Sequence, residues 1–140
     1  MKKVFVQLLL ISCILPCQAK NYQVMSPNKS IIVQIEENET LSYSVLFHGK
    51  TIIEPSALGR FEWKNEPASG NNLEVIQTAN RSHNETWTPV VKSKHAQIKD
   101  QYNELTLFLR EKKEQRRTID ITFRVYDDGV AFRYKLYRGA

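Results

Sequence analysis

The clearest hydrophobic pattern lies between Thr118 and Tyr137, where two alternating runs flank the polar sequence Asp127-Asp128-Gly129. In each run the apolar residues occupy every second position: Ile119, Ile121, Phe123 and Val125 in the first, and Val130, Phe132, Tyr134 and Leu136 in the second. A period of two is typical of a β-strand with one face in a core. The Asp-Asp-Gly sequence supplies residues that tolerate positive φ in a tight turn. The pattern therefore predicts a β-hairpin.

Alternation also predicts strands elsewhere in the chain, at Ser30 to Glu36, Leu41 to Phe47 and Tyr102 to Arg110. Asn21 to Lys29 is expected to be a polar lead-in that ends in a turn. A third strand, Thr51 to Glu54, is expected to stop at Pro55, because proline cannot donate a hydrogen bond to a neighbouring strand. These segments predict an opening meander of three strands.

The middle of the chain, Ser56 to Lys99, is less regular. Gly59 to Trp63 is predicted as a short strand or as a loop that buries two aromatic rings, and Lys64 to Asn72 as a loop. Leu73 to Gln77 is predicted as a short strand, and Trp87 to Val91 as an edge strand or an irregular extension. No run has helical periodicity, so roughly seven to nine short strands predict an all-β fold, an antiparallel β-sandwich.

The N-terminus has the features of an export signal. Met1-Lys2-Lys3 is positively charged, Val4 to Leu15 is apolar, and Cys17-Gln18-Ala19 ends in a small residue suited to cleavage. Residues 1–19 are therefore predicted to be a signal peptide, and the mature chain, 20–140, to be exported to the periplasm. The apolar run is shorter than the roughly 20 residues that a membrane-spanning helix needs. A lipoprotein is the alternative, because Leu10 to Cys13 resembles a lipobox.

The formal net charge is +5, and it falls to +3 once Lys2 and Lys3 are subtracted with the signal peptide. The remaining basic residues are interleaved with acids, which is not the basic patch of a nucleic-acid-binding protein. The densest group, Lys112 to Arg117, shares its turn with two glutamates. A solvated loop is the main interpretation of this group, with an anion site as the alternative.

The residue types that carry chemistry form no catalytic or metal-binding motif. His48, His83 and His95 are far apart, and both cysteines lie in the predicted signal peptide. The acids fall on turns or on outward strand positions, so no catalytic residue is predicted. Trp63 and Trp87 could stack on sugar rings, or they could fill a core or pack on a further domain.

The segment RVYDDGVAFRYKL, from Arg124 to Leu136, resembles part of the N-terminal domain of glycoside hydrolase family 97, which comprises bacterial α-glucosidases and α-galactosidases. Three further segments agree with that domain in kind and order: Ser26 to Ile35, Leu41 to Lys50 and Asp100 to Leu105. The resemblance implies a β-sandwich of the super-sandwich type that precedes a catalytic (β/α)8 barrel. It also implies that further strands follow residue 140, so that the sandwich is expected to be incomplete at its C-terminal end.

The resemblance makes the expected function structural. This chain would be a non-catalytic segment that packs on the barrel and shapes a pocket for an α-linked oligosaccharide. Trp63, Trp87, Asn103 and Glu104 are the candidate residues for the carbohydrate or interface surface. No cofactor is expected in this chain, whereas the parent enzyme would bind calcium. The alternative is a free-standing secreted carbohydrate-binding or adhesin-like module.

Overall fold

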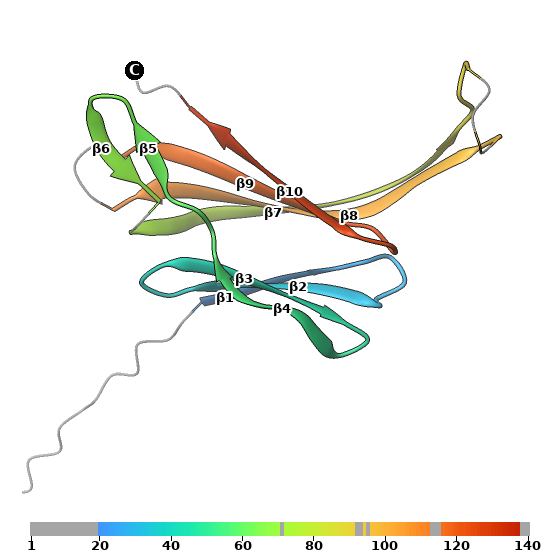
Figure 1. Cartoon of the computed structure of the whole chain (residues 1–140), viewed down its shortest axis with the longest axis horizontal. Coiled ribbons are helices and arrows are strands. Elements are labelled where there is room, and N and C mark those ends of the chain that lie inside the picture. Colours follow the sequence, from blue (N-terminus) through green and yellow to red (C-terminus); the bar gives the residue numbers. More distant parts are fainter. Residues whose placement is uncertain (1–19, 71, 92–93, 95, 113–115, 138–140) are drawn as a thin grey trace, which may run out of the picture.

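A computed structural model describes residues 20–70, 72–91, 94, 96–112 and 116–137 (Figure 1). The predicted signal peptide, 1–19, lies outside the described residues. Every regular element in the described part of the chain is a β-strand. The described residues therefore contain no helix that could cross a membrane. The strands are β1 (Lys20–Met25), β2 (Ile31–Glu37), β3 (Leu41–Phe47), β4 (Lys50–Ala57), β5 (Phe61–Trp63), β6 (Glu66–Ser69), β7 (Leu73–Trp87), β8 (Ile98–Glu111), β9 (Thr118–Val125) and β10 (Val130–Leu136).

Two four-stranded antiparallel sheets stack face to face, as Figure 1 shows. The first sheet has the order β1-β2-β3-β4 and the second has the order β10-β9-β8-β7. The small β5–β6 hairpin lies near one end of the second sheet. The prediction of an all-β antiparallel sandwich is confirmed.

The core forms where the alternating residues of the two sheets meet. The inward residues of β2, β8 and β9 are almost completely buried: Ile31, Val33, Ile35, Leu105, Leu107, Leu109, Ile119, Ile121, Phe123 and Val125. Burying one such side chain contributes about 1.5–3 kcal/mol. The sequence pattern predicted this core correctly because each of these strands has one dry face.

Two expectations about the first sheet are wrong. Lys20–Met25 is not a lead-in but a strand, which pairs with β2 and buries Val24. Pro55 does not end β4, which continues to Ala57. Two residues of β4, Glu54 and Pro55, lie opposite one residue of β3, which makes a bulge. A proline is tolerated there because β4 is an edge strand.

The second sheet differs from expectation in its longest strand. Leu73–Trp87 is one strand of 15 residues, whereas the sequence predicted a short strand, a polar passage and an irregular extension. Most of this strand is exposed, so it carries no alternation of buried and exposed positions, and its pairing with β8 defines it. The predicted loop from Lys64 to Asn72 is also wrong in part, because it contains β6.

The predicted hairpin is present as β9 and β10, but the conformation of its turn differs. The connection has four residues, 126–129, and the Tyr126 N–H donates to the carbonyl of Gly129 at 2.8 Å. Neither Asp127, Asp128 nor Gly129 has positive φ. A four-residue loop does not require left-handed residues, whereas the two-residue turns do. Instead, Asp127 Oδ1 accepts a hydrogen bond from the Asn28 N–H at 2.9 Å and links the turn to the first sheet.

Candidate functional site

The ends of β7 and β8 project beyond the rest of the second sheet as a two-stranded arm, seen on the right of Figure 1. The pairing of β8 with β9 stops at Asn103 opposite Val125, whereas β7 and β8 continue to Trp87 opposite Ile98. We define the arm as the paired residues 84–87 and 98–101 together with residues 88–91 of the loop that follows β7. Three of the four candidate residues belong to it or to its base: Trp87, Asn103 and Glu104.

The tip of the arm carries exposed apolar side chains, and the exposed Lys94 follows them in the same loop. Trp87, at the end of β7, is 51% exposed, and Val90 and Val91 in the following loop are 104% and 77% exposed. Large apolar side chains gathered on a projection typically mark a site of interaction. Trp87 is therefore placed where it could contact a partner, although its role stays a prediction.

The outer side of the arm's base is a packed cluster of aromatic and charged side chains. Tyr102 is buried although it points away from the core, because its ring lies 4.9 Å from His83 and 5.1 Å from Tyr126 by ring centroids. The guanidinium of Arg124 lies over the same ring, 4.4 Å from its centroid. Cation–π contacts of this kind hold a long side chain in one position.

Glu104 completes this cluster through an ion pair. Arg124 Nε donates to Glu104 Oε2 at 2.6 Å, and the Glu104 side chain is only 12% exposed. This hydrogen bond is the main reason that the pKa of Arg124 is raised above its usual value. Glu104 therefore braces the sheet beneath the arm. The Glu104 carboxylate is thus engaged by a neighbour within the sheet, and its role at a carbohydrate or interface surface stays a prediction.

Asn103 fixes the base of the arm from the inner side. Its Nδ2 donates to the carbonyl of Met25 at 2.8 Å, and its Oδ1 accepts from the Ser82 hydroxyl at 2.7 Å. The first contact joins the two sheets, and the second joins β7 to β8. Asn103 thus ties the base of the arm to the first sheet and to β7.

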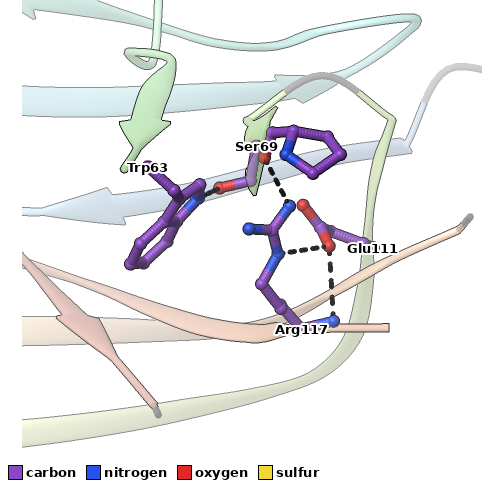
Figure 2. A network of polar contacts seen from close by, with 5 residues as sticks. Trp63, Ser69, Glu111 and Arg117 are labelled. Atoms are coloured by element: carbon purple, nitrogen blue, oxygen red, sulfur yellow. Dashed lines mark hydrogen bonds and ion pairs between the residues drawn. The ribbon is translucent and has the colours of Figure 1, made fainter. Parts of the chain in front are cut away.

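Trp63, the fourth candidate, lies near the opposite end of β7 from Trp87. The β5–β6 hairpin that carries Trp63 contacts the turn between β8 and β9, as Figure 2 shows. The indole Nε1 donates to Ser69 Oγ at 2.8 Å, and the Arg117 guanidinium lies 5.2 Å from the ring centroid. The polar atom and one side of this indole are therefore occupied within the fold. The structure does not bring Trp63 and Trp87 together.

A buried ion pair holds this hairpin in place. Arg117 Nε donates to Glu111 Oε2 at 2.9 Å, and its terminal Nη2 donates to the carbonyl of Pro67 at 2.9 Å (Figure 2). The two side chains are only 11% and 9% exposed. Of the basic group between Lys112 and Arg117, the described Lys112 and Arg116 are exposed, as expected for a solvated loop. The interpretation is wrong for Arg117 and Glu111, which work as a structural clip.

Among the described residues, no group of three or more His, Cys, Asp or Glu side chains could hold a metal ion. The nearest approach is His83, whose Nε2 lies 3.4 Å from Asp100 Oδ2 and 3.7 Å from Glu85 Oε2. The carboxylates of the outer face are engaged by neighbours: Glu104 by Arg124, and Asp120 by the hydroxyl of Tyr137.

The fold and the site define an all-β sandwich module with a braced, projecting arm. A family model described as the glycosyl-hydrolase 97 N-terminal domain matches residues 24–139. The chain therefore belongs to this family, as the resemblance of its segments predicted.

Curated and solved relatives agree with this assignment. A retaining alpha-galactosidase of Bacteroides thetaiotaomicron is 30% identical over 135 residues, which cover 96% of this chain and 19% of that protein. A glycoside hydrolase family 97 enzyme of Pseudoalteromonas sp. strain K8, solved in complex with panose and with acarbose, superposes with a TM-score of 0.78 at 32% identity, covering 85% of this chain and 18% of that one. The crystal structure of a beta-arabinopyranosidase gives 0.73 at 28% identity, covering 84% and 18%. This chain spans less than a fifth of the length of these relatives.

Sequence reasoning missed the partners that hold the candidate residues. Strand register places Arg124 opposite Glu104 and His83 opposite Tyr102, and the rings and the guanidinium then meet around Tyr102. Tyr102, Glu104 and Arg124 all fall on outward positions of alternating strands, and His83 lies opposite Tyr102. Without the register, however, the sequence does not say which outward residues are neighbours.

Proposed function

We propose that this chain is a non-catalytic N-terminal β-sandwich segment of an exported α-glycosidase. In that enzyme it packs on the catalytic domain, a (β/α)8 barrel, and helps to shape the pocket that admits the carbohydrate. The observation that carries the proposal is the family match over residues 24–139 in a chain that corresponds to only 18–19% of its relatives' length. The remaining four-fifths of such an enzyme contains the catalytic domain.

The substrate class follows from the relatives. One of them is a retaining alpha-galactosidase, and another was solved with panose and with acarbose. These support an α-glucoside or an α-galactoside as the substrate of the parent enzyme. Calcium is expected in the parent enzyme; among the described residues of this chain no group of three or more His, Cys, Asp or Glu side chains could hold it.

The structure supports a role beside the substrate rather than in the chemistry. The largely buried carboxylates of Glu104 and Glu111 are each paired with an arginine of this domain. A glycosidase instead needs two carboxyl groups placed on either side of the scissile bond. These residues fit an enzyme in which the barrel carries out catalysis and the sandwich supports it.

One observation favours a second candidate function, a free-standing secreted carbohydrate-binding module. Trp87 is half exposed on a projection, and indole rings stack on the apolar faces of sugars. Such a module would bind an oligosaccharide without any other domain.

The two functions are separated by titrating the purified mature chain, 20–140, with panose, acarbose and an α-galactoside by calorimetry. The proposed function predicts no binding heat and no hydrolysis by this segment alone. The alternative predicts saturable binding that Trp87→Ala abolishes and that a matched change at the other tryptophan, Trp63→Phe, leaves intact. Saturable binding with that dependence would contradict the proposed function.

A further inference from the structure

We propose that the tip of the β7–β8 arm is the anchor by which this domain holds the catalytic domain of its own enzyme. Trp87, Val90 and Val91 insert into an apolar recess on that domain. This inference rests on the proposed function, because it assigns to one element the packing that the proposed function requires. It is separable from it, because the domains could also pack through another face.

The first argument is the chemistry of the tip. Val90 and Val91 are almost wholly exposed and Trp87 is half exposed, so the tip presents three apolar side chains to water. Tryptophan is among the residues that contribute most to binding at protein interfaces, where it fills a pocket surrounded by smaller contacts. One tryptophan and two valines, all exposed, are residue types suited to such an anchor.

The second argument is the architecture of the arm. Beyond the last pair of β8 with β9, the arm is a ribbon of two strands, in which residues 84–87 pair with residues 98–101. At about 3.4 Å per residue, these four pairs give the ribbon a length of roughly 14 Å. A two-stranded ribbon is at best marginally stable alone in water. A partner that covers the tip would supply the missing stabilisation.

The third argument is the rigidity of the base. Tyr102 is held between His83, Tyr126 and Arg124 on one side of the sheet, and Asn103 is bonded to Met25 on the other. The side chains of the base are already fixed, so binding of the tip loses little of their conformational entropy. A braced base under an apolar tip is suited to rigid docking.

The occupant that fits is the catalytic domain of the same polypeptide. Sugars need polar groups that converge on their hydroxyls, and the two valines supply none. Relatives of this chain are more than five times its matched length, so the remainder of the enzyme is tethered next to the arm. Tethering gives a high effective concentration, which makes even a small apolar anchor sufficient.

The experiment measures how fast a thiol placed on the tip reacts in the whole enzyme and in this chain alone. Val90→Cys is labelled with a maleimide, and the modified arm peptide is quantified by mass spectrometry so that other cysteines do not interfere. We expect labelling in the enzyme to be slowed at least about tenfold relative to the isolated mature chain, because a tip docked nine-tenths of the time or more is protected by that factor. Glu39→Cys, on the exposed β2–β3 turn, serves as the matched control and should react equally in both.

Other outcomes overturn the proposal in distinguishable ways. Equal labelling of Val90→Cys in both proteins, with slowed labelling of Arg133→Cys on the outer face of β10, would show that the domains pack through another surface. The proposed function would then stand and the anchor would fail. Equal labelling at all three positions would likewise overturn the anchor, and the calorimetric titration would decide on the proposed function. Protection of Val90→Cys in the isolated chain that grows with concentration would identify a second copy as the occupant.

A second measurement covers the case in which a cysteine at the tip disturbs docking. The triple variant Trp87→Ala, Val90→Ser, Val91→Ser should leave the far-UV circular dichroism of the isolated chain unchanged, because these side chains are exposed. In the enzyme it should split one cooperative thermal transition into two. A single unchanged transition would overturn the anchor.

Discussion

The buried ion pair that clips the β5–β6 hairpin to the second sheet allows a quantitative test. Arg117→Met removes the guanidinium but keeps most of the apolar stem that lies near Trp63. The Glu111 carboxylate, in a side chain that is 9% exposed, then loses its charged partner, and among the contacts of the described residues a 3.4 Å hydrogen bond from the Arg117 backbone N–H remains. The carbonyl of Pro67 loses its donor as well.

The expected cost follows from these contacts. Removing one partner of a buried ion pair typically costs about 3–5 kcal/mol, because the other charge stays buried. The backbone N–H that remains and the slight exposure of both side chains place this case at the lower end, so we expect a loss of about 3 kcal/mol. With an m-value of about 1.5 kcal/mol/M, the midpoint of urea unfolding should fall by about 2 M.

The assay is urea unfolding of the mature chain followed by circular dichroism and by tryptophan fluorescence. Arg110→Met is the matched control, because the Arg110–Glu74 pair has a similar length, 2.8 Å, but its side chains are 39% and 34% exposed. Exposed pairs contribute little, so the midpoint should move much less. In the double variant Arg117→Met, Glu111→Leu the buried charge is gone, and most of the lost stability should return.

An Arg117→Met midpoint within 0.5 M of the wild type, taken as roughly the scatter of such fits, would refute this reasoning. It would mean that Glu111 reaches water after the change, so that the hairpin is not clipped by a buried pair. A double variant less stable than the single variant would point the same way.

Three further predictions concern other parts of the fold. Gly70→Ala should lower the free energy of unfolding by about 1–3 kcal/mol, because Gly70 has a φ of +113° and an added Cβ would lie 2.9 Å from the backbone of Gly59 and Arg60. Gly59→Ala is the control: an added Cβ meets nothing within 4 Å there, so the variant should have little effect in the same urea assay. Burial and a hydrogen bond to the Glu37 carboxylate raise the pKa of Tyr22 from the usual 10.0 to about 12. Because the folded pKa is the higher one, the stability that the Tyr22 hydroxyl contributes is complete below pH 10 and is lost as the pH rises towards 12. Tyr22→Phe should reduce this alkaline loss when the free energy of unfolding is measured across that range. Asn103→Ala should cost about 1–3 kcal/mol by leaving the Met25 carbonyl without its donor, and hydrogen exchange should quicken at the base of the arm; unchanged exchange there would contradict the role given to this amide.

The sequence predicted those strands that bury one face. β2, β3, β8 and β9 each place apolar residues at every second position, and in β2 and in β8 from Leu105 to Arg110 buried and less buried positions alternate as predicted. In β9 both faces are largely buried, because Asp120 and Thr122 between the apolar residues are covered as well. β7 was not predicted as one strand because most of its residues are exposed. Its conformation is set by hydrogen bonds to β8, and such pairing leaves no trace in the periodicity of the strand itself.

The candidate site could be predicted only in part, for a related reason. Trp87, Asn103 and Glu104 were chosen separately, and the register of β7 with β8 is what places them along one arm and its base. The ion pair of Glu104 with Arg124 depends on the pairing of β8 with β9, which aligns these two residues directly. Trp63 lies elsewhere because the β5–β6 hairpin is clipped to the other end of the sheet by Arg117.

The central claim, that this chain is the front part of an α-glycosidase, is tested most directly by reading the coding DNA downstream of the codon for Ala140. We expect a continuation, in frame or after one frameshift, into several hundred codons with alternating strand and helix patterns that encode a (β/α)8 barrel. A stop codon with no barrel-coding sequence near it would contradict the proposed enzyme and leave the free-standing carbohydrate-binding module as the function to test.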